Sequence, residues 1–185
     1  MAPMAPPTTR PRKTVQDYLA LPDDVRAELI DGELYVTPSP RPRHQDAAGR
    51  LYRVLLDWAD ATGAGAVYVA PLDVHLPSGD VVQPDVLFVR TEHASIVSDW
   101  VRGAPDLAVE VVSPAGGLRD RLVKRDLYAR NGIPAYWIAD PEERSIEMLR
   151  LEGSSYRPEA FVTGEQDLVT PAWPGLRIPL TSVFR

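Results

Sequence analysis

The sequence predicts an α/β fold in which helices cover the faces of a mixed β-sheet. The first observation is the order of elements: a long amphipathic helix, three strands, a second helix and a further strand, typical of a layered α/β domain. The second is a change of period, because apolar residues recur every three to four positions in the helices, whereas the strands are short β-branched runs. The chain has 185 residues, 44% hydrophobic and 25% charged, so it can bury a core.

The N-terminal part contains a leader, a short helix and a hairpin. Residues 1–13 are rich in proline and predict a disordered leader before a single domain over residues 14–185. Thr14 begins a sequence that is typical of a helix capping box. Asp31 and Gly32 lie between two apolar runs, and this dipeptide predicts a two-residue β-hairpin.

The clearest helix is expected over residues 43–61. Its apolar positions form one stripe, made of Ala47, Ala48, Leu51, Val54, Leu55, Trp58 and Ala59. Gly63 ends this helix. Strands are then expected at residues 66–75, with or without a bend at Pro71, at 81–89 and at 107–112.

The C-terminal part continues the alternation of helix and strand. A helix is expected over residues 118–130, where Asn131 and Gly132 stop it. Strands follow at residues 135–139 and 146–151, and a tail rich in proline and glycine closes the domain.

Two acidic residues interrupt apolar, β-branched runs that predict buried strands. Asp85 lies in the run 81–89, and Glu110 lies in the run 107–112. Burying a carboxylate costs free energy unless another group pairs with it. Two such carboxylates on neighbouring strands therefore suggest a shared hard cation, Mg²⁺ or Mn²⁺.

Lysine is rare in this chain. The sequence has 20 basic residues, but only Lys13 and Lys124 are lysines, and Lys13 lies at the edge of the leader. A lysine ammonium is a compact point charge that can also lose its proton, whereas arginine stays charged. Lys124 is therefore either a functional amine or a surface lysine paired with Asp120 one turn earlier.

The composition excludes several kinds of site and partner. The chain has no cysteine, which rules out disulfides and thiolate metal sites and fits a cytoplasmic location. No apolar run is long enough to span a membrane. The net charge of −6 has the wrong sign for binding nucleic acid by bulk charge, and no base-reading motif is visible.

Five segments carry a resemblance to a known family. They are Asp31-Gly32-Glu33-Leu34; Ser39-Pro40 with His44-Gln45; Pro84-Asp85-Val86; Pro105 to Pro114; and Lys124 through Tyr128 to Pro141. In this order they resemble the Uma-two family of restriction endonucleases, and the resemblance covers roughly residues 14–185.

This family is similar to nucleases with a PD-(D/E)XK core, in which a mixed sheet flanked by helices presents two metal-binding acids and a lysine. The resemblance implies a restriction-endonuclease-like fold and Mg²⁺- or Mn²⁺-dependent hydrolysis of DNA, with Asp85 and Glu110 as catalytic metal ligands. The lysine expected two residues after Glu110 is missing, since Val112 stands there. The resemblance implies that Lys124 supplies the amine from the next helix, where Tyr128 shares its face.

Three other acidic or basic residues have two interpretations each. His44 opens the long helix and either contacts the site or a phosphate, or makes a hydrogen bond at the helix start. Glu33 follows the hairpin turn and is either an auxiliary acid or an exposed carboxylate. Asp106 is expected to cap the start of a strand rather than to bind metal.

The predicted substrate contacts are electrostatic. Four arginines near the start of the long helix are expected to bind phosphates, with solvated helix faces as the alternative: Arg41, Arg43, Arg50 and Arg53. Binding through phosphates weakens as the salt concentration rises.

A second hypothesis places the protein in another functional class. The acidic net charge and the missing strand lysine also suit a nuclease fold retained as a catalytically inactive binding or regulatory module. For the enzyme, cleavage of both DNA strands usually needs two active sites, so a homodimer is expected. The strand at 146–151 and the tail are the expected contact surface.

Overall fold

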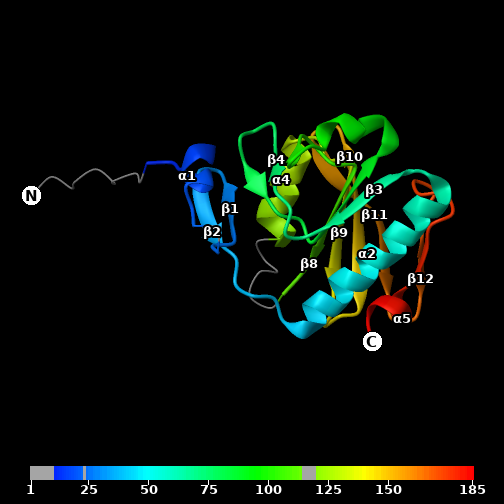
Figure 1. Ribbon diagram of the computed structural model, residues 1–185. Helices are drawn as coiled ribbons and strands as arrows, with labels where there is room; N and C mark the ends of the chain where they lie inside the picture. The colour runs from blue at the N-terminus through cyan, green and yellow to red at the C-terminus, as the bar shows by residue number, and fades with distance from the viewer. Residues whose placement is uncertain (1–10, 23, 114–119) are drawn as a thin grey trace, which may run out of the picture.

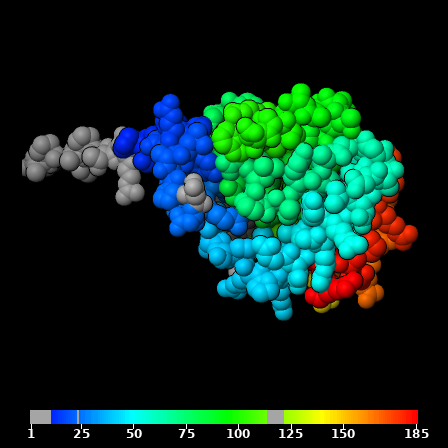
Figure 2. All heavy atoms as spheres, in the orientation of Figure 1, coloured from blue at the N-terminus to red at the C-terminus, as the bar shows by residue number. Residues whose placement is uncertain are grey.

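The computed structural model describes residues 11–22, 24–113 and 120–185. Figure 1 shows the N-terminal hairpin at one end of the molecule and the central sheet, crossed by helix α2, towards the other end. In the space-filling view, the N-terminal segment (blue) and the C-terminal segment (red) lie at opposite sides (Figure 2). Most of the predicted leader, residues 1–10, lies outside the described residues.

The helical segments are short apart from α2. They are α1 (Val15–Leu19), α2 (Pro42–Thr62), the 3₁₀ segment η1 (Thr91–Ile96), the π-helical turn η2 (Asp120–Lys124), α4 (Arg125–Arg130) and α5 (Leu180–Val183). The predicted capping box at Thr14 is confirmed, and Gly63 ends α2 with a φ of 65°. In the described segments, no helix combines the length and the hydropathy needed to span a membrane.

The central sheet has six strands. In spatial order they are β11 (Ser155–Thr163), β10 (Ser145–Glu152), β9 (Ala135–Asp140), β8 (Leu107–Val111), β6 (Val86–Arg90) and β3 (Gly65–Val69). The pair β8–β9 is parallel, and the other neighbours are antiparallel. The predicted mixed sheet is therefore confirmed.

A second mixed sheet carries the hairpin. Its strands in spatial order are β2 (Glu33–Val36), β1 (Ala27–Ile30), β5 (Val81–Val82), β4 (Val74–His75) and β7 (Val101–Arg102). The predicted hairpin is confirmed, with Asp31 and Gly32 at φ of 53° and 77° in its turn. A two-stranded sheet of β12 (Asp167–Val169) and β13 (Arg177–Pro179) completes the described strands.

Two predicted strands are wrong in their extent because each passes from one sheet to the other. Residues 66–75 divide into β3 and β4, with Pro71 between them, and residues 81–89 divide into β5 and β6, with Pro84 between them. A proline has no N–H to donate to a strand ladder, so it suits these crossings. As a result, Asp85 lies immediately before β6 rather than inside a strand.

The two faces of the central sheet are covered by different elements. Leu107, Val109 and Val111 of β8 pack in the apolar cluster with the buried stripe of α2. Ala108 belongs to the cluster on the opposite face, together with residues of α4 such as Leu127. Because side chains alternate along a strand, Glu110 is placed on the same face as α4.

The strand part of the expected dimer surface is wrong. Strand β10 is internal to the sheet, paired with β9 on one side and β11 on the other, and Ile146, Met148 and Leu149 are fully buried. The tail forms β12, β13 and α5. Its residues Ile178 and Leu180 pack in the same apolar cluster as the buried stripe of α2. The buried residues of these segments stabilise the domain, whereas Val169 of β12 remains 63% exposed.

Candidate active site

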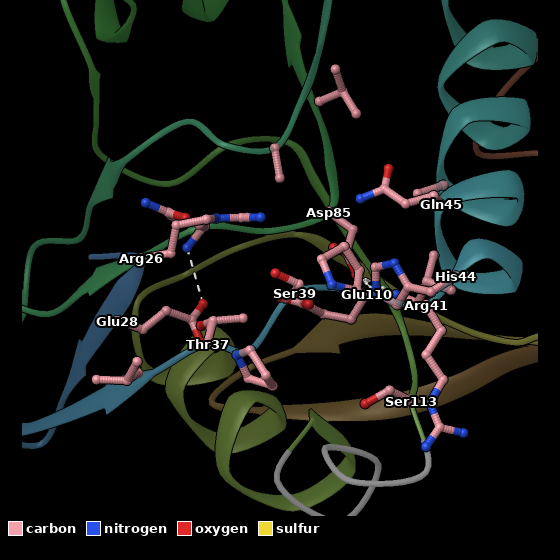
Figure 3. A pocket seen from close by; sticks show the side chains of 18 of the residues that line it. Arg26, Glu28, Thr37, Ser39, Arg41, His44, Gln45, Asp85, Glu110 and Ser113 are labelled. Carbon is pink, nitrogen blue, oxygen red and sulfur yellow. Dashed lines mark hydrogen bonds and ion pairs between the residues drawn. The ribbon is translucent and has the colours of Figure 1, made fainter. Parts of the chain in front are cut away.

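A cavity of about 510 Å³ lies where the hairpin, the start of α2 and the strands β6 and β8 meet. This volume is in the range of small-ligand sites. Its charged lining residues are Arg26, Glu28, Arg41, Asp85, Glu110 and Lys124, and His44 also contributes. Figure 3 shows Arg26 and Glu28 on the hairpin side, Arg41 and His44 on the α2 side, and Asp85 and Glu110 between them.

Glu110 is held by two side chains from one helical face. Lys124 Nζ lies 2.7 Å from Glu110 Oε1, and the Tyr128 hydroxyl donates to the same oxygen at 2.6 Å. Lys124 and Tyr128 are four residues apart, which places them one above the other on the helix. The predicted approach of this helix face to the Glu110 strand is thus observed.

Lys124 is also bound by a carboxylate that the sequence did not bring to notice. Its Nζ lies 2.9 Å from Glu28 Oε1, and the exposed fractions of the Lys124 and Glu28 side chains are only 4% and 3%. Glu28 further accepts a hydrogen bond from the main-chain N–H of Gln83 at 3.0 Å. Lys124 is therefore a buried cation between two buried carboxylates, and not the surface lysine of the alternative interpretation.

Asp85 is tied to the strand of Glu110 through the main chain. The N–H of Val111, the residue after Glu110, donates to Asp85 Oδ2 at 2.8 Å. His44 Nε2 lies 3.1 Å from the same oxygen, and both side chains are mostly buried. The structure therefore brings His44 to Asp85, as one of its two interpretations expected.

The donor set suits a hard divalent cation. Mg²⁺ is usually bound by one or two carboxylates and keeps several water molecules, so two acids at one cavity are sufficient. Both contacts that the Asp85 carboxylate makes with described residues use Oδ2, so Oδ1 can accept a cation. Within the described residues there is no group of three or more His, Cys, Asp or Glu side chains arranged as a metal site.

Tyr128 acts as a neutral hydrogen-bond donor. Burial, followed by the negative charges of Glu110 and Glu28, raises the pKa of the Tyr128 phenol well above its usual value. The phenol therefore keeps its proton at neutral pH and donates it to Glu110 Oε1.

The predicted phosphate-binding cluster is divided by the structure. Arg41 lines the cavity. Arg43 instead pairs with Glu142 at 3.0 Å, Arg53 with Asp57 at 3.7 Å, and Arg50 donates to the main-chain oxygen of Val183 at 3.1 Å. Only Arg41 of the four is at the cavity, because successive positions of a helix face different directions.

Two further candidate acids lie away from the cavity lining. Glu33 is exposed and accepts a hydrogen bond from the Tyr35 hydroxyl at 2.9 Å, which is the exposed hairpin carboxylate of its second interpretation. Asp106 accepts from the main-chain N–H of Arg90 at 2.8 Å and lies 2.9 Å from His93 Nδ1. Asp106 fixes the start of β8, as expected.

Glu28 is the site residue that the sequence reasoning missed. The signal was present, because Glu28 stands among Ala27, Leu29 and Ile30, and all four positions are buried. The same reasoning that selected Asp85 and Glu110, an acid in an apolar run, applies to it. Glu28 lies close to the turn at Asp31 and Gly32, and residues next to a hairpin turn are usually exposed.

Comparison with known proteins agrees with the fold. Residues 15–181 match the Uma2 family, described as "putative restriction endonuclease". The chain belongs to the Uma2 family. No curated protein matches it.

The Uma2 protein is also similar to a solved structure. This is the crystal structure of a "putative nuclease belonging to DUF820" from Anabaena variabilis ATCC 29413, with a TM-score of 0.77 and 17% sequence identity. The match covers 92% of the present chain and 97% of the other. The fold is therefore restriction-endonuclease-like, as the resemblance implied. The description of the family supports a nuclease function.

Proposed function

We propose that this Uma2 protein hydrolyses phosphodiester bonds of DNA with the help of Mg²⁺ or Mn²⁺ held by Asp85 and Glu110. The observation that carries the proposal is the contact of 2.7 Å between Lys124 and Glu110 in a cavity that Asp85 also lines. Two carboxylates can hold a divalent cation, and an ammonium can stabilise the negative charge on the phosphate. A lysine on the helix takes the place of the missing strand lysine, since position 112 is a buried valine.

Each residue has a separate task in this proposal. A bound divalent cation supplies a water of lowered pKa and polarises the phosphoryl oxygen. Lys124 places a positive charge beside the site, where negative charge grows on the phosphate. Tyr128 and Glu28 are positioning residues, because the first holds Glu110 and the second holds Lys124. His44 orients Asp85 through Oδ2.

Substitution of the proposed ligands tests the enzyme. Purified protein is incubated with single-stranded, duplex and nicked DNA in Mg²⁺ or Mn²⁺, and cleavage is followed on gels. Removal of one ligand is expected to cost about 3 kcal/mol of transition-state stabilisation, or about a hundredfold in rate. Asp85→Ala should show this loss, whereas Asp57→Ala, an exposed acid on α2, should cut as wild type does. Equal cleavage by both variants would refute the assignment of Asp85.

The burial of Lys124 favours a second candidate function. Lys124 is 3% exposed, and two carboxylates contact its ammonium, an arrangement that also suits a purely structural ion pair. The protein would then be a nuclease fold kept as a non-catalytic module. Calorimetry with Mn²⁺ separates the two, because metal binding that is abolished by Glu110→Ala argues for the enzyme, and absence of metal binding argues for the module.

The homodimer is part of the proposal for the enzyme. Double-strand cleavage by one active site per subunit calls for two subunits related by symmetry. Strand β10 is internal to the central sheet, so its edge cannot form the contact. Light scattering at micromolar concentration tests this, and a strictly monomeric mass would count against it.

A further inference from the structure

The charges around the cavity are balanced before any cation binds. Among the described residues, three acids and three bases line it: the acids are Glu28, Asp85 and Glu110, and the bases are Arg26, Arg41 and Lys124. Lys124 is engaged with Glu28 and Glu110. A divalent cation held by the acids makes the lining net positive, so the complete site attracts an anion with more than one charge.

Arg26 presents an unsatisfied donor in the wall of this cavity. Its main-chain oxygen accepts from the N–H of Thr37 at 2.9 Å, which places it directly before β1 at the open end of the hairpin. Arg26 and Glu28 are two residues apart and so lie on the same face. Arg26 Nε is buried and has no hydrogen-bond partner among the described residues. A buried donor without a partner costs free energy, so it points to a ligand group that completes it.

Arg41 occupies the opposite side of the cavity. It is the residue immediately before α2, and Figure 3 shows Asp85 and Glu110 between it and Arg26. No described acid forms an ion pair with Arg26 or Arg41, and Arg150, which lies away from the cavity, pairs with Glu152 at 2.9 Å. Guanidinium groups are well suited to bind phosphate oxygens.

We propose that Arg26 and Arg41 bind the phosphates on either side of the scissile one, so that the substrate is a DNA strand with several consecutive charged linkages. This inference rests on the proposed function, because Asp85 and Glu110 define the position of the scissile phosphate. It assigns Arg26 a substrate-binding role. Of the four arginines expected from the sequence to bind phosphate, it keeps only Arg41. A mononucleotide or a dinucleotide with one phosphate can engage at most one of the two guanidiniums.

The first test is binding without turnover. The probe is a fluorescently labelled single-stranded oligodeoxynucleotide, and its anisotropy is measured in Ca²⁺ at several salt concentrations. Arg26→Gln and Arg41→Gln should each weaken binding about tenfold and lower the salt slope by about one. Arg150→Gln should bind as wild type does. If Arg26→Gln binds as tightly as Arg150→Gln, the proposal is overturned, and melting curves of the variants exclude misfolding as the cause of a loss.

The second test neutralises the ligand instead of the protein. A methylphosphonate linkage, which carries no charge, replaces one phosphodiester at a time beside the cleavage position. At one position the replacement should weaken binding to wild type about tenfold. The same replacement should weaken binding to Arg26→Gln much less, because that variant already lacks the guanidinium that contacts this phosphate. Equal losses for both proteins at every position would show that Arg26 meets no phosphate.

The two proposals can fail separately. If wild type binds the oligonucleotide in an Arg26- and Arg41-dependent way but never cuts it, the binding inference stands and the enzyme proposal fails. If wild type cuts, the arginine variants should raise KM and leave kcat unchanged, as expected for contacts that act equally on substrate and transition state. Cleavage with an unchanged KM in both variants would overturn the inference alone.

Discussion

Replacement of Lys124 by methionine removes the cation that two buried carboxylates share. Lys124 Nζ lies 2.9 Å from Glu28 and 2.7 Å from Glu110, and both acids are 3% exposed. Removing one partner of a buried ion pair costs about 3–5 kcal/mol, because the remaining charge is left without compensation. Methionine is unbranched and fills a similar volume, so little of this cost comes from packing. We therefore expect the free energy of unfolding to fall by about 3–5 kcal/mol.

The expected change is large enough for a simple assay. For a chain of this length, 1 kcal/mol shifts the melting temperature by roughly 2–4 °C, so Lys124→Met should melt about 6–20 °C below wild type. Melting is followed by circular dichroism at pH 7. A double variant with Glu28→Gln should recover part of the loss, because one of the two uncompensated charges is then removed as well.

The chain offers a matched control in its other lysine. Lys13 pairs with Asp17 at 3.3 Å, and both side chains are well exposed. An exposed pair of this spacing contributes about 0.5 kcal/mol or less, so Lys13→Met should melt close to wild type. If Lys124→Met and Lys13→Met melt together, the carboxylates do not depend on Lys124 and the reasoning is refuted.

Three further substitutions have defined outcomes. Tyr128→Phe removes the donor to Glu110 and should lower the free energy of unfolding at pH 7 by about 1.5–3 kcal/mol. Because the phenol of raised pKa stabilises the fold only while it is protonated, wild type should lose stability above about pH 10, and the variant should lose less there than wild type does. Chemical denaturation at pH 7 and at alkaline pH measures both effects. Burial lowers the pKa of His75 below 6.5, so the stability that neutral His75 contributes is present above pH 6.5 and declines as the pH falls through the folded pKa. In urea unfolding, the free energy of unfolding of His75→Gln should fall less than that of wild type between about pH 6.5 and pH 5. The same fall in both proteins would contradict this. Thr14→Ala should cost about 1 kcal/mol by breaking the capping box with Asp17, and a melting temperature identical to wild type would argue against that box.

The sequence predicted those features that depend on local pattern. The turn at Asp31 and Gly32 needs left-handed backbone angles, and few residue pairs other than this one accept them. The α2 stripe follows from its period, and most of its positions are buried. The convergence of Glu110 with Lys124 and Tyr128 was predictable because a spacing of four on a helix fixes their common face.

The remaining features depend on contacts that no local pattern encodes. The passage of residues 66–75 and 81–89 between two sheets is set by pairing partners distant in sequence. Glu28 became a site residue only because β1 packs near Lys124, nearly a hundred positions later. Similarly, a cluster of arginines in sequence spreads around a helix, and Arg43 met Glu142 rather than the cavity.

The hydrogen bond from the Val111 amide to Asp85 has a consequence for how this site tolerates sequence change. The donor is the peptide group and not a side chain, so nearly any amino acid at position 111 can supply it, and proline alone cannot. The placement of Asp85 beside the strand of Glu110 thus depends on the peptide backbone, and substitutions of the surrounding side chains leave this hydrogen bond in place. Random mutagenesis that selects for an intact Asp85 environment should therefore recover diverse apolar residues at position 111, but never proline.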